Sequence, residues 1–219
     1  MVELDKKTQF MQSNGIVFIL SAPSGTGKTT IRRMLKQKIP DLKFSVSHTT
    51  REARNEETEG VDYYFIPQKD FEKKIERGEF LEWAKVSKHY YGTAFESVDR
   101  HRRNGEDLLI ELDVQGAQSL RGINYKAVFI FMMPPSLREL EARLNKRGTE
   151  SEGMIRARME VSKKEVQQLT LYDYILTNLN TEETTGNLLS IIRAEHFRKE
   201  LYEPSSPDLN SLINNKVNT

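Results

Sequence analysis

The chain has 219 residues, with 33 lysines and arginines against 32 aspartates and glutamates, and it contains no cysteine. We expect a chain of this length to form one domain with a substantial core, and the lack of cysteine excludes a disulfide framework, a cysteine nucleophile and a cysteine zinc site. The near-neutral charge argues against a general nucleic-acid binder or a protein of anionic membranes, because both need a net basic surface.

The two ends of the chain differ from the rest in composition. Residues 1–14 are polar and lack the order of a secretory signal, so we expect an N-terminal extension. Residues 204–219 are rich in Asn, Ser and Pro and are expected to form a flexible tail. The longest apolar runs, 16–20 and 127–133, are far shorter than the ~20 residues that cross a bilayer. We therefore expect a cytoplasmic protein.

Short apolar runs alternate with helical patterns along most of the chain. The apolar runs predict strands buried on both faces at 16–20, 108–112, 127–133 and 172–176. The helical patterns cover 28–39, 114–120, 137–146, 155–169 and 182–201. This alternation is typical of a parallel sheet covered by helices, so the predicted fold class is α/β.

Two stretches break the alternation. Residues 44–95 contain charged clusters and alternating patterns at 62–66 and 79–86, which predict a small, partly antiparallel insertion. Residues 146–158 are irregular, with two glycines among charges, and are expected to form a mobile flap.

The strongest local signal is a glycine-rich loop between the first strand and the first helix. Its sequence is Ser21-Ala22-Pro23-Ser24-Gly25-Thr26-Gly27-Lys28-Thr29-Thr30, in which Ala22 replaces the first glycine of the P-loop pattern. Such a loop turns several backbone N–H groups toward one phosphate chain, and the helix N-terminus adds a positive dipole. Lys28 is expected to bind the β- and γ-phosphates, and Thr29 to offer its hydroxyl to Mg²⁺. A P-loop predicts a nucleotide, not a reaction.

A second candidate site lies in the insertion. Arg51 and Arg54 are three residues apart and can converge on one anion, since guanidinium groups suit phosphate oxygens. A solvated loop is the alternative, because acidic residues surround them. Glu82 shares a strand face with apolar residues, where a carboxylate needs donors such as the N1–H and amino group of guanine. A structural salt bridge is the alternative for Glu82, and the sequence leaves open which strand face is buried.

Together these motifs resemble the guanylate kinases of the bacterial type, which transfer a phosphoryl group from ATP to GMP. The shared pattern contains the P-loop, Ser47-x-Thr49-Thr50-Arg51-x-x-Arg54, Glu57, Gly60, Asp62-Tyr63, Phe80-Leu81-Glu82-Trp83, Tyr90-Tyr91-Gly92-Thr93, 111–116 and 147–152. The match covers roughly residues 15–203. It departs at Ala53 and Glu56, where the family usually has proline and glycine, so this turn is expected to be more flexible.

The resemblance implies a P-loop nucleoside-monophosphate kinase fold, in which a helix-covered parallel sheet carries an inserted mixed-sheet GMP-binding region and a lid. The core would comprise 15–46, 96–145 and 161–203, the GMP-binding region 47–95, and the lid 146–160. Arg156 and Arg158 are two apart and point in different directions on a helix, so only one should face the site, and position favours Arg158.

The resemblance also implies a role for each matched residue. The GMP phosphate would be bound by Arg51, Arg54, Tyr63 and Tyr91, and guanine by Ser47, Glu82, Thr93 and Asp113. ATP would be bound by Ala22, Pro23, Ser24, Gly25, Thr26, Gly27, Lys28, Thr29, Thr30 and Asn178, with Asn178 near the adenine. The catalytic set would be Lys28, Arg51, Arg147 and Arg158, while Mg²⁺ would use Thr29. Asp113 could serve guanine, a Mg²⁺-bound water, or both.

The substrates implied are ATP and GMP, with dGMP as a further acceptor, and neither a nucleic acid nor a membrane is expected as a partner. The sequence does not indicate an oligomeric state. Two alternatives compete with this function. One is a catalytically silent guanylate-kinase-like binding module, although such modules typically lack the P-loop lysine that is present here as Lys28. The other is a kinase for a different phosphate acceptor.

Overall fold

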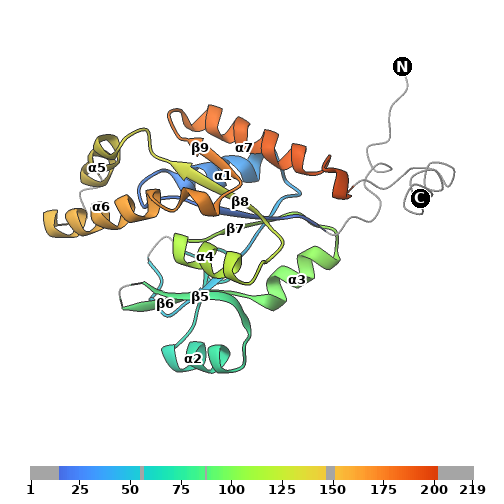
Figure 1. Cartoon of the computed structure of the whole chain (residues 1–219). Helices are drawn as coiled ribbons and strands as arrows, with labels where there is room; N and C mark the ends of the chain where they lie inside the picture. The colour runs from blue at the N-terminus through green and yellow to red at the C-terminus, as the bar shows by residue number, and fades with distance from the viewer. Residues whose placement is uncertain (1–14, 55–56, 87, 147–150, 202–219) are drawn as a thin grey trace, which may run out of the picture.

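The computed structural model describes residues 15–54, 57–86, 88–146 and 151–201, and its centre is a five-stranded sheet (Figure 1). The strands are β1 (Val17–Ser21), β2 (Lys43–Phe44), β7 (Leu108–Glu111), β8 (Val128–Met133) and β9 (Tyr174–Thr177). They lie in the order β2-β7-β1-β8-β9, and every pair runs parallel. The predicted α/β fold is confirmed.

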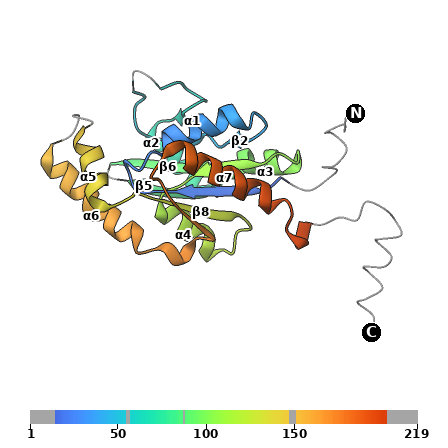
Figure 2. The same ribbon diagram turned by 90° about the horizontal axis from the view of Figure 1, so that it is seen from above.

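The helices cover both faces of this sheet (Figure 2). One face carries α1 (Lys28–Lys38) and α7 (Thr181–Glu195), and the other carries α3 (Phe95–Arg103) and α4 (Val114–Gly122). The helices α5 (Leu137–Lys146) and α6 (Glu152–Val166) pack against each other through a cluster of their own, and η1 (Leu169–Leu171) and η2 (Lys199–Leu201) are 3-10 turns. Successive side chains of β1 enter opposite layers: Phe18 packs with residues of α1 and α7, and Ile19 with residues of α3 and α4. All five residues of β1 are therefore buried.

Three details differ from the expectations drawn from sequence. The strand β9 is not buried on both faces, because it lies at the sheet edge and Ile175 is 49% exposed. The last helix is shorter than predicted: α7 ends at Glu195, where the chain turns so that Arg198 pairs with the buried Glu195 carboxylate. The segment predicted to be irregular is helical from Glu152, since Ser151 caps α6 through a hydrogen bond from the Met154 N–H. The remainder of that predicted flap, at 147–150, lies outside the described residues.

The insertion forms a second sheet with strand order β4-β3-β6-β5. Its elements are β3 (Ser47–Thr49), β4 (Tyr63–Phe65), α2 (Gln68–Glu76), β5 (Phe80–Val86) and β6 (His89–Ala94). The pair β3–β4 is parallel, whereas β3–β6 and β5–β6 are antiparallel, which confirms the prediction of a partly antiparallel insertion. A small core supports it, in which the rings of Phe71 and Phe80 stack 4.4 Å apart.

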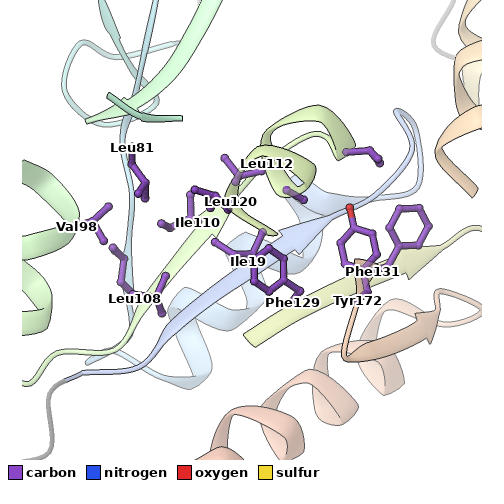
Figure 3. Packing of buried hydrophobic residues seen from close by; sticks show 13 residues of the cluster. Ile19, Leu81, Val98, Leu108, Ile110, Leu112, Leu120, Phe129, Phe131 and Tyr172 are labelled. Carbon is purple, nitrogen blue, oxygen red and sulfur yellow. The ribbon is translucent and has the colours of Figure 1, made fainter. Parts of the chain in front are cut away.

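The two sheets share one hydrophobic layer. Leu81 of β5 lies with Val98 of α3 and with Ile110 and Leu112 beside the central sheet (Figure 3). This packing brings the start of β5 close to the carboxyl end of β7. Among the helices of the described residues, none is long and apolar enough to cross a membrane.

Candidate active site

The P-loop joins β1 to α1 and is shaped by two glycines. Gly25 and Gly27 have φ angles of 93° and 107°, in the left-handed region that favours glycine. The Thr26 N–H donates to the Pro23 carbonyl over 3.2 Å and closes the turn, while the Thr26 side chain is fully buried. Ser24 and the residues Thr29 and Thr30 are exposed to solvent. The loop is thus anchored on one side and open on the other.

Lys28 lies folded back over the loop. Its Nζ donates to the Ala22 carbonyl oxygen over 2.7 Å. Burial lowers the pKa of Lys28, and the nearby carboxylates of Glu111, Glu165 and Asp113 oppose that shift. A desolvated ammonium group has three N–H donors, and the bond to Ala22 uses one of them. The group is therefore suited to bind an anion.

The carboxylates of Glu111 and Asp113 lie at the carboxyl end of β7, which is next to β1 in the sheet. This edge is where open α/β sheets bind ligands. Asp113 caps α4, because its Oδ1 accepts a hydrogen bond from the Gly116 N–H over 2.8 Å. Glu111 lies 3.5 Å from Nε of Arg32, and Arg32 also donates to the Val61 carbonyl, so α1 is joined to the insertion.

The helix α6 contacts the P-loop through an arginine. Arg158 donates from a terminal guanidinium nitrogen to Ser24 Oγ over 3.3 Å. Arg156 instead pairs with Glu152 at 3.3 Å, on the exposed side of the helix. Of the two arginines, Arg158 is therefore the one that reaches the P-loop. Arg147, the other arginine expected here, lies outside the described residues.

A cationic corner forms where β3 leaves the second sheet. Both terminal nitrogens of Arg51 donate to the Glu57 carboxylate at 2.8 Å, and the Arg54 N–H donates to the same carboxylate at 2.9 Å. The contact with Arg51 lowers the pKa of Glu57 and raises that of Arg51. Arg51 also lies 5.4 Å from the ring centre of Tyr63. Glu57 therefore organises the turn that carries both arginines, whereas position 56 lies outside the described residues.

The Tyr63 and Tyr91 rings meet edge to face beside this corner, with their centres 6.0 Å apart. The Arg51 side chain is only 15% exposed. Arg51 is therefore not a residue of a simple solvated loop, whereas Arg54 is exposed to solvent.

Glu82 is buried at the junction of the two sheets, with 8% of its surface exposed. Its Oε1 accepts a hydrogen bond from the Thr93 N–H over 3.0 Å, and Thr93 Oγ1 lies 3.3 Å from Ser47 Oγ. Burial raises the pKa of Glu82 to about 7; the hydrogen bonds from Thr93 oppose the shift and the Asp113 charge adds to it. Within the described residues Glu82 forms no salt bridge, in contrast to the structural alternative considered above.

Both faces of β5 are buried at its start. A register shift between Phe80 and Glu82 buries Phe80, Leu81 and Glu82 in succession, and Trp83 is 44% exposed. Glu82 Oε2 approaches the first turn of α4 so closely that a Cβ on Gly116 would lie 2.8 Å from it. The carboxylate thus lies at a helix N-terminus, where negative charge is favoured.

Asn178 follows β9 and is also buried, with 3% exposed. Its Nδ2 donates to the Thr26 carbonyl oxygen of the P-loop over 2.7 Å. The predicted ATP-site residue is therefore next to the loop backbone.

Two acidic residues at this site had no role in the sequence-based interpretation. Glu111 faces Arg32, and Glu165 of α6 has a buried Oε2 with no hydrogen-bond partner within the described residues. Burial raises the pKa of Glu165 to about 7, the Lys28 charge opposes this shift, and the Asp113 charge adds to it. A helical signal could have found Glu165, because it lies seven residues after Arg158 and shares its helix face.

Comparison with known proteins shows the family of the chain. A sequence model of guanylate kinases matches residues 14–195. The guanylate kinase of Myxococcus xanthus is 43% identical over 192 residues, which cover 87% of this chain and 92% of the relative. That of Bacillus subtilis is 38% identical over 195 residues, covering 89% and 96% of the two chains.

A solved structure is similar as well. The crystal structure of guanylate kinase from Anaplasma phagocytophilum has a TM-score of 0.70 and 31% sequence identity, and the match covers 86% of this chain and 89% of that one. The family match, the relatives and this structure all span most of the chain, so the protein belongs to the guanylate kinase family.

Proposed function

We propose that this chain is an ATP:GMP phosphotransferase, which transfers the γ-phosphoryl group of ATP to GMP and yields GDP and ADP. The observation that carries the proposal is the buried Glu82 carboxylate, which forms no salt bridge within the described residues and lies near Asp113 at the end of the P-loop sheet. A buried carboxylate without a cation needs hydrogen-bond donors, and guanine supplies two. Adenine offers no matching pair.

In this proposal the insertion binds GMP. Glu82 accepts hydrogen bonds from the guanine N1–H and amino group, with Ser47, Thr93 and Asp113 beside it. The phosphate lies in the cationic corner, where Arg51, Arg54, Tyr63 and Tyr91 bind its oxygens. The bidentate Glu57 contact keeps the Arg51 guanidinium in place before the phosphate arrives. The same residues would accept dGMP.

The P-loop binds ATP, with its backbone N–H groups and Lys28 directed at the phosphates. Oxygen donors suit Mg²⁺, and the exposed Thr29 hydroxyl and the Asp113 carboxylate are such donors. The described residues hold no group of three or more His, Cys, Asp or Glu that could bind a metal by themselves, which fits an ion that keeps waters and arrives with phosphates. When bound, Mg²⁺ neutralises part of the polyphosphate charge.

Phosphoryl transfer requires positioning and charge stabilisation more than covalent help from the protein. The GMP phosphate is already an anion, so no general base is needed to make it a nucleophile. The difficulty is the repulsion between two anionic substrates. Lys28, Arg51, Arg54 and Arg158 offset this repulsion, and Arg147 would add a further charge, so that the charge spread over the transition state is stabilised.

Water must be kept from the γ-phosphate, since ATP would otherwise be hydrolysed. Closure of segment 146–160 and of region 47–95 over the substrates would exclude water and assemble the arginines only when both nucleotides are bound. The contact of Arg158 with Ser24 supports this view, because it already joins α6 to the ATP site. A cytoplasmic location, where both nucleotides are found, completes the proposal.

The experiment is ADP release from ATP and Mg²⁺, with GMP, dGMP, AMP, UMP and CMP offered separately. We expect fast turnover with GMP and dGMP alone, and its loss by at least a hundredfold in Lys28→Ala, because phosphate charge then lacks its main cation. Turnover with another nucleotide and not with GMP would mean that this nucleotide is the acceptor. Binding of GMP without any turnover would favour the silent binding module.

A further inference from the structure

Asn178 contacts the P-loop from a position 152 residues away in the chain. Its Nδ2 donates to the Thr26 carbonyl oxygen, and its own backbone N–H donates to the Met133 carbonyl over 2.9 Å. The second bond attaches Asn178 to the end of β8, which lies between β1 and β9 in the central sheet. The side chain is therefore held by a rigid element while it binds the loop.

The bond to Thr26 fixes more than one carbonyl group. The Thr26 carbonyl and the Gly27 N–H belong to the same peptide unit, which is planar and trans, so the two groups point in opposite directions. When Asn178 holds the carbonyl, the Gly27 N–H must point away from Asn178. Within the described residues this N–H has no acceptor. P-loops use such N–H groups to bind phosphate oxygens.

The fit between Asn178 and the loop is close. A Cβ on Gly27 would lie 2.9 Å from Asn178 Nδ2, so a side chain at position 27 would press on the amide. The opposite amide orientation would place Oδ1 against the Thr26 carbonyl, where two acceptors repel each other. The Asn178 amide N–H is thus bonded to the P-loop, and the residue is only 3% exposed. Its Oδ1 has no hydrogen-bond partner, so the bond to Thr26 is the one hydrogen bond of this side chain within the described residues.

We propose that Asn178 is a positioning residue of the P-loop: it orients the Thr26–Gly27 peptide so that the Gly27 N–H faces the polyphosphate. This proposal rests on ATP as the phosphoryl donor. Asn178 then acts on every ligand that carries a polyphosphate, whatever its base. This role is distinct from the position near the adenine that the family resemblance implies.

The test compares equilibrium binding of two ligands, ADP and inorganic tripolyphosphate, each with Mg²⁺, to the full-length chain by calorimetry. The variants are Asn178→Ala and Asn178→Asp. The control is Asn180→Ala, which removes an asparagine that caps α7 through hydrogen bonds from the Glu182 and Glu183 N–H groups and is bonded to no P-loop atom. Because neither GMP nor turnover is involved, the result does not depend on which acceptor the enzyme uses.

We expect Asn178→Ala to weaken both ligands by a similar factor of about ten, because a buried carbonyl loses its donor and the peptide is free to rotate. Asn178→Asp should weaken both further, since its carboxylate repels the carbonyl and the phosphates. In steady state the KM for ATP should rise while the KM for GMP stays unchanged. Asn180→Ala should lower the unfolding temperature and leave both affinities intact.

Three results would overturn the proposal. A loss limited to ADP, with tripolyphosphate unaffected, would mean that Asn178 reads the base. An equal loss in Asn180→Ala would mean that the effect is general destabilisation. Unchanged binding of both ligands in Asn178→Ala would mean that the loop holds its shape without this bond.

Discussion

At the scale of single residues, the proposed binding of guanine by Glu82 predicts a pH dependence. Its pKa is raised to about 7 by burial, and only the ionised form offers two acceptors to guanine. We expect kcat/KM for GMP to fall as the pH drops below about 7, while the affinity for ADP changes little. Glu82→Gln should lower kcat/KM by about 30- to 100-fold, because the variant sets an amide N–H against a guanine donor.

The measurement is the ratio of wild-type to Glu82→Gln kcat/KM across pH, in which the titration of GMP itself cancels. The ratio should rise toward pH 8 and level off. Glu79→Gln is the matched control, since Glu79 lies three residues earlier and pairs with Lys74 near the surface. Glu165 has a similarly raised pKa, so Glu165→Gln is needed as well. If Glu165→Gln removes the pH dependence and Glu82→Gln does not, Glu82 is not the titrating group.

At the scale of elements, α6 carries two arginines whose surroundings differ sharply. Arg158 touches Ser24 of the P-loop, whereas Arg156 pairs with Glu152 and is exposed. We expect Arg158→Ala to lower kcat by about a hundredfold, in line with the loss of a cation directed at transition-state charge. Arg156→Ala should leave kcat within a factor of about two, because exposed pairs contribute little. Single-turnover kinetics would check both, and equal losses in the two variants would contradict this role for Arg158.

Elements also show what the sequence could and could not predict. Buried parallel strands such as β1 and β8 are continuous apolar runs, so they were predicted well. The strand β2 has only two residues and was not predicted, since no periodicity fits in so short a segment. Glu82 was singled out from sequence, but its burial depends on a register shift in β5 that alternation cannot reveal. The contact of Asn178 joins segments 152 residues apart, so only the folded chain brings it about.

At the scale of the whole molecule, several groups make the folded state less stable as pH rises above about 5. The carboxyl groups of Glu82 and Glu165 have raised pKa values, so the folded chain binds their protons more tightly than the unfolded chain does. His196 lies 2.6 Å from the Asp107 carboxylate, and this hydrogen bond raises its pKa despite partial burial. Its contribution is present below the unfolded value of about 6.5 and is lost as pH rises through the raised value.

We therefore expect these three groups to lower the unfolding temperature from pH 5.5 to pH 8.5, with about 2–4 °C for each kcal/mol lost. His48 acts in the opposite direction, because burial lowers its pKa, and three groups outweigh one. Glu165→Gln and His196→Asn should each reduce this slope. His89→Asn is the control, because among the described residues His89 is in no ion pair with a carboxylate, unlike His196. Thermal unfolding in buffers of equal ionic strength would measure this slope. An unfolding temperature that rises from pH 5.5 to pH 8.5 would refute the assignment of the slope to Glu82, Glu165 and His196.

If Glu82 binds guanine as proposed, stability and substrate binding oppose each other, because the ionised Glu82 that destabilises the empty protein is then the form that binds guanine. A ligand stabilises the folded state in proportion to its affinity, so GMP should raise the unfolding temperature more at pH 8 than at pH 6. In Glu82→Gln this difference should shrink to the part that the titration of the GMP phosphate itself causes, while stabilisation by ADP should change with pH as it does in wild type. If GMP stabilises wild type equally at pH 6 and pH 8, its binding does not depend on the charge of Glu82.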